Sequence, residues 1–223
     1  MRDRPSFTFE ITGGDLGLDF PNTRVRRPTP QPVEHLHTYD DLVSWGVQAG
    51  AIPANEAARL RALAARRPRA ARAALARAIE LRETLFAIFS AAASGLPTPE
   101  SALAHMNRAL PDALRHLQLV GGAEGVSWAW TDEPRLDRIL WPVIRAAALL
   151  LTSKDGERVR ECAARDCDWL FVDTSRNGTR RWCDMSVCGN REKARRFQHR
   201  ARRRAGGGRG GSRSRIHGGH GPR

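Results

Sequence analysis

The sequence predicts an α+β, mainly α, fold in which a helical N-terminal domain with short strands precedes a small C-terminal unit made of a hairpin and a helix. Three observations predict it. Stretches with helical spacing of apolar residues fill most of the first 155 residues, short alternating runs are bounded by glycine, and all four cysteines lie between residues 162 and 188. The length of 223 residues suits one medium domain and one small one.

The first elements of the chain are expected to be extended. Residues 7–20 read as short strands around Gly13 and Gly14, and Pro21 is expected to end the last strand early. Residues 23–33 are rich in Pro and Arg, so we expect a loop there.

A series of helices follows. The pattern predicts helices over residues 39–48, with Gly50 as the stop signal, and over 55–66, 68–93 and 136–151. Another helix is expected to run to Leu110, with Thr98 as its N-cap and Pro99 in its first turn. Residues 116–120 and 126–130 are expected to pair as a hairpin across Gly121 and Gly122.

The chain divides into three parts. A turn at residues 154–156 predicts a boundary between a domain of residues 1–155 and a C-terminal unit of residues 156–204. Residues 205–223 are dominated by Gly, Ser and Arg and cannot form a core, so we expect a disordered tail.

The positive charge is concentrated at the C-terminal end. The formal charge is +13; residues 156–223 hold 18 Lys and Arg against 7 Asp and Glu, whereas residues 1–155 hold 19 against 17. Such a segment attracts polyanions, and nucleic acid is the expected partner. The alternative is a basic segment that is only solvated.

The chain shows no targeting or membrane signal. The N-terminus is mixed and charged, and the longest apolar patch, residues 146–151, is far shorter than the roughly 18 residues of a membrane span. We therefore expect a soluble cytoplasmic protein, with association with the nucleoid as a further expectation, and no membrane partner.

The four cysteines form two pairs with equal spacing. Cys162 and Cys167 are separated by four residues, as are Cys183 and Cys188, and fifteen residues lie between the pairs. Zinc needs four converging soft donors, which two such pairs supply; four cysteines leave no open coordination position, so the pattern predicts one structural zinc ion. Two disulfides, four buried thiols and a redox dithiol are the alternatives, of which disulfides are disfavoured without a secretion signal.

The residues around the cysteines predict the rest of the unit. Residues 169–173 alternate like a strand, the Asn177-Gly178 dipeptide is a strong turn signal, and residues 180–183 are expected to return as the second strand. A helix follows Cys188 with Asn190 as its cap. Its narrow apolar face, Ala194, Phe197 and Ala201, is expected to pack on the hairpin.

The remaining surface of this helix and hairpin is cationic. Such a helix can lie in a major groove or contact phosphates, and its N-terminal residues usually reach the bases, so Arg191 is the expected base reader. RNA is an alternative partner, through stacking on Trp169, Phe171 or Trp182, and a zinc-shaped protein-interaction module is another. The candidate nucleic-acid contacts are Arg176, Arg180, Arg181, Arg191, Lys193, Arg195, Arg196 and Arg200.

These residues resemble a known motif. Residues 162–200 are similar to the CGNR zinc finger, through the tetrapeptide at 188–191 and also Trp169-Leu170-Phe171, Asp173, Ser175 to Gly178, Arg181-Trp182-Cys183, Met185 and Lys193-Ala194. The upstream chain resembles the ABATE domain, through Gly13-Gly14, Leu18-Asp19-Phe20, Asn22-Thr23, Asp41-Leu42, Trp45, Gly50, Leu81-Arg82-Glu83 and Arg145-Ala146-Ala147.

The resemblance implies a function. Proteins of this kind are regarded as stress-responsive bacterial transcription regulators, in which the finger binds DNA and the ABATE part senses a signal. It implies DNA as the partner and a small-molecule effector as a further candidate. A single finger with one helix offers modest specificity, so we also expect a homodimer or an extra contact through the tail.

The N-terminal domain shows no catalytic set. GxSxG, P-loop and HExxH motifs are absent from the sequence, so we expect no enzyme. Histidines at 35 and 37 beside acids at 40 and 41 are expected to be ordinary loop residues rather than a metal site. Because a buried Arg needs a carboxylate, we expect an Asp19–Arg82 ion pair, with a small-ligand pocket as the alternative. The candidate pocket residues are Asp19, Asn22, Arg82 and Arg145.

Overall fold

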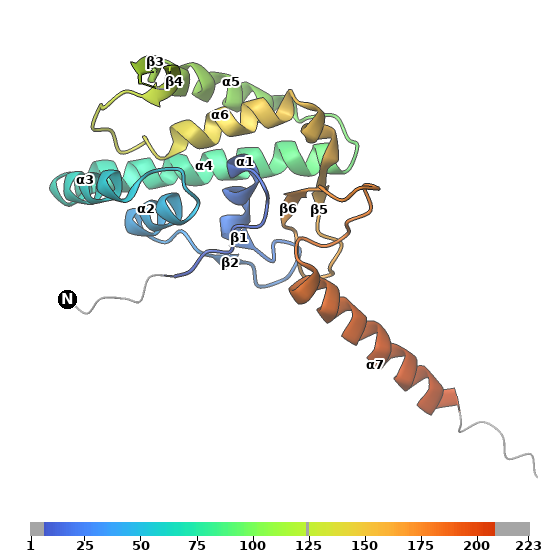
Figure 1. The fold of residues 1–223 in the computed structure, drawn as a ribbon. Helices are drawn as coiled ribbons and strands as arrows, with labels where there is room; N and C mark the ends of the chain where they lie inside the picture. Colours follow the sequence, from blue (N-terminus) through green and yellow to red (C-terminus); the bar gives the residue numbers. More distant parts are fainter. Residues whose placement is uncertain (1–6, 124, 208–223) are drawn as a thin grey trace, which may run out of the picture.

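The computed structural model describes residues 7–123 and 125–207, with side chains to residue 201. Figure 1 shows a bundle of helices around the long helix α4 (Pro68–Ala93), with the C-terminal unit at one end of it and α7 (Asn190–Gly207) projecting away. The mainly helical α+β class is confirmed, as is the small C-terminal unit with a hairpin and a helix.

Residues 7–15 are irregular and residues 16–19 are helical, where strands were expected. Asp15 caps the short helix α1 (Leu16–Asp19), accepting a hydrogen bond of 2.7 Å from the Gly17 amide. Pro21 does not end a strand but opens a 3₁₀ turn, η1 (Pro21–Thr23). The prediction of strands over residues 7–20 is wrong, because the Asp15 cap turns the chain before an extended run can pair.

Close packing explains why α1 contains Gly17. A Cβ atom at this position would lie 2.8 Å from the Cα of Ala147 in α6 (Leu140–Leu151). The glycine therefore lets α1 sit directly on the backbone of α6, and this contact places Asp19 and the following residues beside the C-terminal unit.

The segment expected as a loop contains a pair of short strands. β1 (Arg24–Val25) and β2 (Val33–Glu34) pair antiparallel, with Arg24 opposite Glu34. The two strands meet because the Pro-rich residues between them form a turn, in which Arg26 has a φ of 61°.

The first helices agree with the sequence pattern. α2 (Tyr39–Gln48) begins with a capping box of Thr38 and Asp41, and Gly50 follows it with a φ of 73°. α3 (Ala54–Arg66) and α4 lie within one residue of their predicted bounds.

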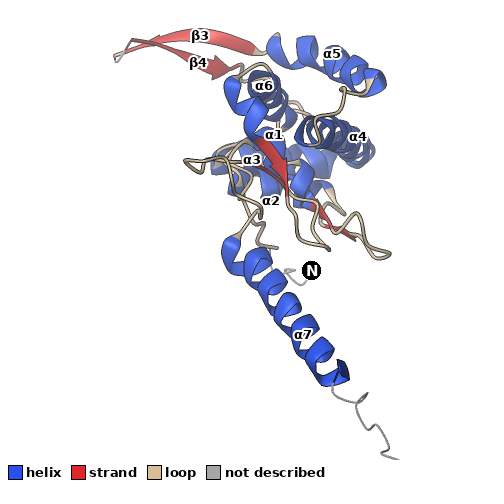
Figure 2. Cartoon of the chain, turned by 90° about the vertical axis from the view of Figure 1, so that its right-hand side faces the viewer, coloured by secondary structure: helices blue, strands red, loops and turns tan. Residues whose placement is uncertain are grey.

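The two later helices differ from prediction at their ends. α5 (Glu100–Leu114) has Pro99 at its N-cap position without a side-chain cap, so Thr98 does not cap it, and it continues past Pro111. α6 begins at Leu140, four residues after the predicted start. The hairpin between them is confirmed as β3 (Leu117–Gly122) and β4 (Gly125–Trp130), which project from the body in Figure 2.

The C-terminal unit shares the hydrophobic core of the helical domain. β5 (Val159–Glu161) pairs antiparallel with β6 (Leu170–Val172), after the 3₁₀ turn η2 (Lys154–Arg158). Val159, Leu170 and Val172 belong to the same buried cluster as the apolar face of α4. The strands are thus packed against the helices rather than joined to them by a flexible linker.

The strand pairing corrects the predicted hairpin. β6 pairs with β5, not with residues 180–183. Gly178 does adopt a positive φ of 63°, but the buried Asp173 carboxylate accepts hydrogen bonds from Ser175 and from the Arg180 amide and shapes the loop instead. Burial of Val159 in the shared core selects β5 as the partner.

The last helix leaves the body of the molecule. A helical turn, η3 (Met185–Gly189), precedes α7, and Asp184 caps it by accepting from the Val187 amide, so Asn190 lies inside the helix and is not its cap. Phe197 is 74% exposed, and Ala194 is also exposed, so the predicted packing of this face on the hairpin is wrong. α7 extends to Gly207, and the rest of the predicted Gly/Arg tail lies outside the described residues.

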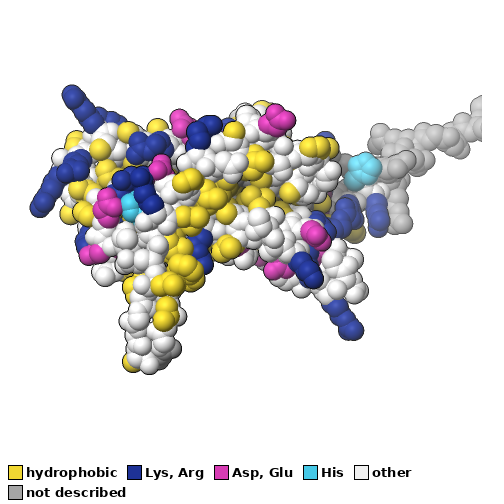
Figure 3. Space-filling view, turned by 90° about the horizontal axis from the view of Figure 1, so that it is seen from above, with side chains coloured by type: hydrophobic (Ala, Val, Ile, Leu, Met, Phe, Trp, Pro, Cys, Tyr) yellow, Lys and Arg dark blue, Asp and Glu magenta, His cyan; other side chains and the backbone are white. Residues whose placement is uncertain are grey.

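Figure 3 shows mixed charged and apolar side chains over the helical body. Among the described residues, no helix has the length and apolar character needed to cross a membrane.

Candidate metal centre and nucleic-acid interface

The four cysteines converge on one point. Their sulfur atoms all lie within 4.8 Å of one another, and Cys162, Cys183 and Cys188 are buried. Cys162 follows β5, Cys167 lies in the β5–β6 loop, and the second pair lies around η3. Backbone hydrogen bonds hold these loops together: the Cys162 amide donates to the Trp169 carbonyl at 2.8 Å, and the Ala163 amide donates to the Arg181 carbonyl at 2.9 Å.

The sulfur spacing fits zinc. In a tetrahedral site with Zn–S bonds of 2.3 Å, neighbouring sulfur atoms are about 3.8 Å apart. The Cys167 and Cys183 sulfurs are 3.8 Å apart, and those of Cys183 and Cys188 are 3.6 Å apart. Four thiolates complete the coordination of one zinc ion, which makes the site structural.

The electrostatics of the thiols also favour a cation. The neighbouring Cys167 and Cys183 thiols lower the pKa of the Cys162 thiol. The same proximity raises the pKa of Cys183. One thiolate is therefore stabilised at the expense of its neighbours, and only a metal cation lets all four ionise together.

Three of the candidate nucleic-acid residues are engaged within the structure. The Arg180 guanidinium stacks over Phe171 at 4.3 Å and donates to the Trp182 and Cys183 carbonyls, so it joins the zinc loops. Arg191 donates to the Cys188 sulfur at 3.1 Å and pairs with Asp166 at 3.1 Å.

Arg195 completes this anchor of α7. It pairs with Asp166 at 3.0 Å and with Glu192 at 2.6 Å. The Asp166 carboxylate therefore holds two successive turns of α7 against the zinc loops. Arg191, which we expected to read a base edge, contacts the metal site in this structure.

The other five candidates are exposed. Arg176 and Arg181 lie on the loop before the second cysteine pair, and Lys193, Arg196 and Arg200 lie on α7. Among the described residues none of the five forms an ion pair; Arg181 lies over the Trp182 ring at 5.2 Å. These five side chains are available to a polyanion.

The aromatic residues proposed to stack on RNA are part of the finger's own core. Phe171 is fully buried, and Trp169 and Trp182 are half-buried and pack around the cysteines. Phe171 is therefore not accessible for stacking on an RNA base.

Comparison with known families agrees with this architecture. Residues 14–154 match the sequence model of the ABATE family, whose description reads "putative stress-induced transcription regulator". The chain belongs to the ABATE family. Residues 158–203 match the CGNR zinc finger, and no curated protein matches the chain.

The ABATE domain and the CGNR finger are joined by buried hydrogen bonds. The Asn22 side chain donates to the Leu170 carbonyl and accepts from the Leu170 amide, both at 2.9 Å, so it acts as an added strand residue beside β6. The Val172 amide donates to the Gly13 carbonyl at 2.9 Å. These contacts place the zinc site directly beside the ABATE domain's N-terminal segment.

An ionic contact extends this interface. The buried Asp168 carboxylate pairs with the Arg27 guanidinium at 3.0 Å and accepts from the Arg26 amide at 3.0 Å. Arg27 also stacks over Phe86 of α4 at 4.0 Å. Sequence reasoning missed this pair; the only available signal was an acid between Cys167 and Trp169, which did not indicate a distant partner.

The predicted pocket residues do not form one cluster. Arg82 is buried and makes a two-pronged contact with Glu34, with both N–O distances 2.6 Å, and it also pairs with Glu83 at 2.9 Å. The predicted Asp19–Arg82 pair is therefore wrong: β2 places Glu34 nearer. Asp19 instead accepts from the Gly13 amide at 2.7 Å, and Arg145 lies half-buried on α6.

The acidic and histidine loop before α2 has local roles. Asp41 belongs to the capping box, Asp40 pairs with Arg61 at 2.5 Å, and His35 stacks on Phe7 with 4.2 Å between ring centroids. Within the described residues, the four cysteines are the group that could hold a metal ion.

Proposed function

We propose that this chain is a DNA-binding transcription regulator, in which the CGNR finger binds duplex DNA and the ABATE domain responds to stress or to a ligand. The family description supports the regulatory role. The main support for DNA binding is α7, an exposed cationic helix that is anchored firmly to the finger.

The acidic residue of α7 lies in its first turn, and the basic residues continue along the rest of the helix. Glu192, the acid in its first turn, is paired with Arg195. From residue 193 to residue 204 the sequence holds seven basic residues and no acid. The described side chains in this stretch are largely exposed, so the helix presents unpaired positive charge to the surroundings.

The size and attachment of α7 suit a DNA groove. Its 18 residues give a length of about 27 Å, and a major groove admits an α-helix. Figure 1 shows it clear of the helical body, and the Asp166 pairs fix its direction. The loop cations Arg176 and Arg181 lie on the same finger and add contacts to the flanking phosphates.

The test compares two variants with equal loss of charge. Binding of labelled duplex DNA by the zinc-loaded chain is followed by fluorescence anisotropy over a salt titration. Arg196→Gln with Arg200→Gln should weaken binding and reduce the slope of log K against log salt by about 2. Arg69→Gln with Arg72→Gln, which removes two exposed charges from α4 at the far end of the body, should change neither.

Other outcomes would contradict the proposal. Equal effects of the two double variants would mean that total charge alone causes binding. No binding at moderate salt would favour a protein-interaction module, and preferential competition by single-stranded RNA would favour an RNA-binding protein.

A further inference from the structure

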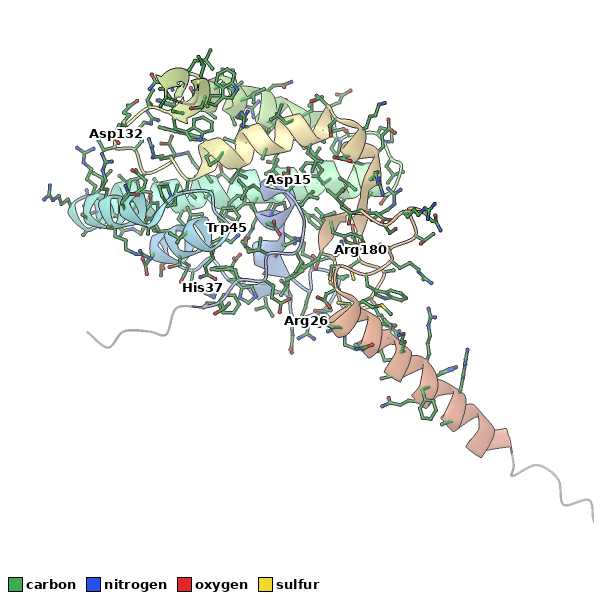
Figure 4. The ribbon with its side chains drawn as sticks, viewed as in Figure 1. Asp15, Arg26, His37, Trp45, Asp132 and Arg180 are labelled. Carbon is green, nitrogen blue, oxygen red and sulfur yellow. The ribbon has the colours of Figure 1, made fainter. Side chains whose placement is uncertain are left out.

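A cavity lies between the ABATE domain and the CGNR finger. Its volume, counted without the zinc ion, is about 340 Å³, at the lower end of the range of small-molecule sites, and three zinc ligands, Cys167, Cys183 and Cys188, form part of its wall. The ABATE side contributes residues from the N-terminal segment, α1, η1, the β1–β2 region and α2, and the finger side contributes the cysteine loops and the start of α7. In Figure 4, Arg26 lies close to where α7 begins, and Trp45 lies farther inside the ABATE domain, at α2.

The walls of the cavity are unusually aromatic. Five ring side chains line it, four from the ABATE side and one from the finger: Phe7, Phe9, His35, Trp45 and Trp169. Trp45 is fully buried, and its indole N–H has no acceptor among the described residues. A buried donor without a partner is costly, which indicates that a bound molecule completes the site.

A buried carboxylate lies in the same wall. Asp19 is 4% exposed and forms no ion pair within the described part of the chain. Its carboxylate accepts a hydrogen bond of 2.7 Å from the Gly13 amide and is also bonded by the Thr12 amide. A buried carboxylate without a cation costs stability, and such groups gather at functional sites.

The net charge around the cavity is negative. Besides Asp19, its lining includes Glu10, Asp166 and Asp184, against the cations Arg26 and Arg191. Arg191 is already paired with Asp166. A zinc tetrathiolate centre carries net negative charge as well, so metal loading strengthens this bias.

We propose that this cavity binds a small organic cation, an amine or ammonium compound whose charge faces Asp19 and whose body packs among the aromatic rings. Carboxylate and aromatic faces together are the chemistry that recognises such cations. Binding of the organic cation to the cavity does not depend on the proposed function. The expected effect of this ligand on DNA binding does rest on the proposed function.

The position of the cavity gives the ligand a route to the DNA-binding helix. Trp169 and Arg191 lie on the finger side, and Arg191 anchors α7 through Asp166. A ligand that contacts both domains binds differently to different arrangements of the finger, and this difference is what couples two sites. The ligand should therefore alter the affinity of the chain for DNA.

The test uses three probes of similar size and different charge. Binding of benzylamine, benzyl alcohol and benzoate to the full zinc-loaded chain is measured by NMR titration, with the Trp45 indole N–H signal as the local reporter, assigned by Trp45→Phe. Benzylamine should bind at least about tenfold more tightly than the other two, and it should shift the Trp45 signal.

A matched pair of variants locates the charge. Asp19→Asn keeps the size of the side chain and should weaken benzylamine binding by about tenfold, whereas Asp112→Asn, an exposed acid of α5 away from the cavity, should leave it unchanged. Glu10→Gln at the exposed edge of the cavity is a second variant, expected to weaken binding less, in case Asp19→Asn does not fold.

Two results would overturn the proposal: equal binding of the three probes, or unchanged benzylamine binding in both cavity variants. DNA binding is measured separately on the same proteins. Loss of one activity with retention of the other therefore distinguishes failure of the ligand site from failure of the proposed function.

Discussion

Asp19 is a buried carboxyl group of α1 that has no cationic partner among the described residues. The sequence placed it after an apolar run and suggested Arg82 as its partner, but Arg82 pairs with Glu34 and Glu83. Burial raises the pKa of Asp19 to about 6, despite hydrogen bonds from the Gly13 and Thr12 amides. The folded protein therefore holds a proton at this carboxyl more tightly than the unfolded chain does.

This shift predicts a pH dependence of stability. A raised carboxyl pKa contributes stability that is fully present below the unfolded value of 3.8 and is lost as pH rises through about 6. Between pH 5 and pH 8, the zinc-loaded chain should lose on the order of 1–2 kcal/mol relative to Asp19→Asn. Urea unfolding of both proteins at the two pH values measures this difference; a difference that does not vary with pH would refute the assignment.

At the scale of elements, the zinc loops depend on metal for their form. The second cysteine pair lies around η3 and the first around the β5–β6 loop, and few strand or helix hydrogen bonds connect these segments. The strands themselves are packed into the core of the ABATE domain through Val159, Leu170 and Val172. The metal therefore stabilises the loops and the start of α7 more than it stabilises β5 and β6.

Because the finger and the ABATE domain share one core, we expect metal removal to lower the stability of the whole chain. A chelator, or serine at all four cysteine positions, should lower the unfolding midpoint of the whole chain by on the order of 10 °C, in one transition. Thermal melts followed by circular dichroism, with zinc re-addition as the control, measure it. Two separate transitions, with the helical one unchanged, would show that the finger folds independently.

At the scale of the whole molecule, the ABATE domain and the CGNR finger form one packed body from which α7 projects (Figure 1). Asn22 links the two domains through paired hydrogen bonds to Leu170, and Asp168 links them through Arg27. The ABATE domain therefore contacts the zinc site directly, without a flexible linker between them.

Asn22 tests this connection. Asn22→Ala leaves the buried Leu170 amide and carbonyl without partners and should destabilise the chain by about 2–4 kcal/mol. The zinc of this variant should also be extracted faster by a chelator, because β6 leads into the cysteine loops. Asn107→Ala, exposed on α5, is the control and should change neither quantity. If the Asn22→Ala protein is less stable but loses zinc at an unchanged rate, the Asn22–Leu170 contact does not affect the zinc site.

Local patterns in the sequence were sufficient for much of the architecture. Helical spacing predicted α2, α3 and α4 closely, and glycine-bounded alternation predicted the β3–β4 hairpin. The spacing of the cysteines predicted the metal centre, since pairs so close in the chain need only a loop closure to meet. These features depend on residues near one another in sequence.

The partners of buried polar groups were decided by the tertiary structure. The pairing of β6 with β5, the Arg82–Glu34 contact and the Asn22–Leu170 hydrogen bonds each depend on which distant segment is buried beside the group. The strong Asn177-Gly178 turn signal did not specify a hairpin because burial of Val159 outweighs a local turn preference.

The sequence by itself determined the helices, the zinc ligands and the cationic character of the C-terminal unit. The tertiary structure alone decided which arginines are exposed, that Asp19 is buried without a cationic partner in the described part of the chain, and that the two domains enclose a cavity. The physical reason is that helical periodicity and charge are local properties of the chain. Desolvation and pairing are determined by neighbours that folding brings from far along the chain, as Asn22 and Leu170 show.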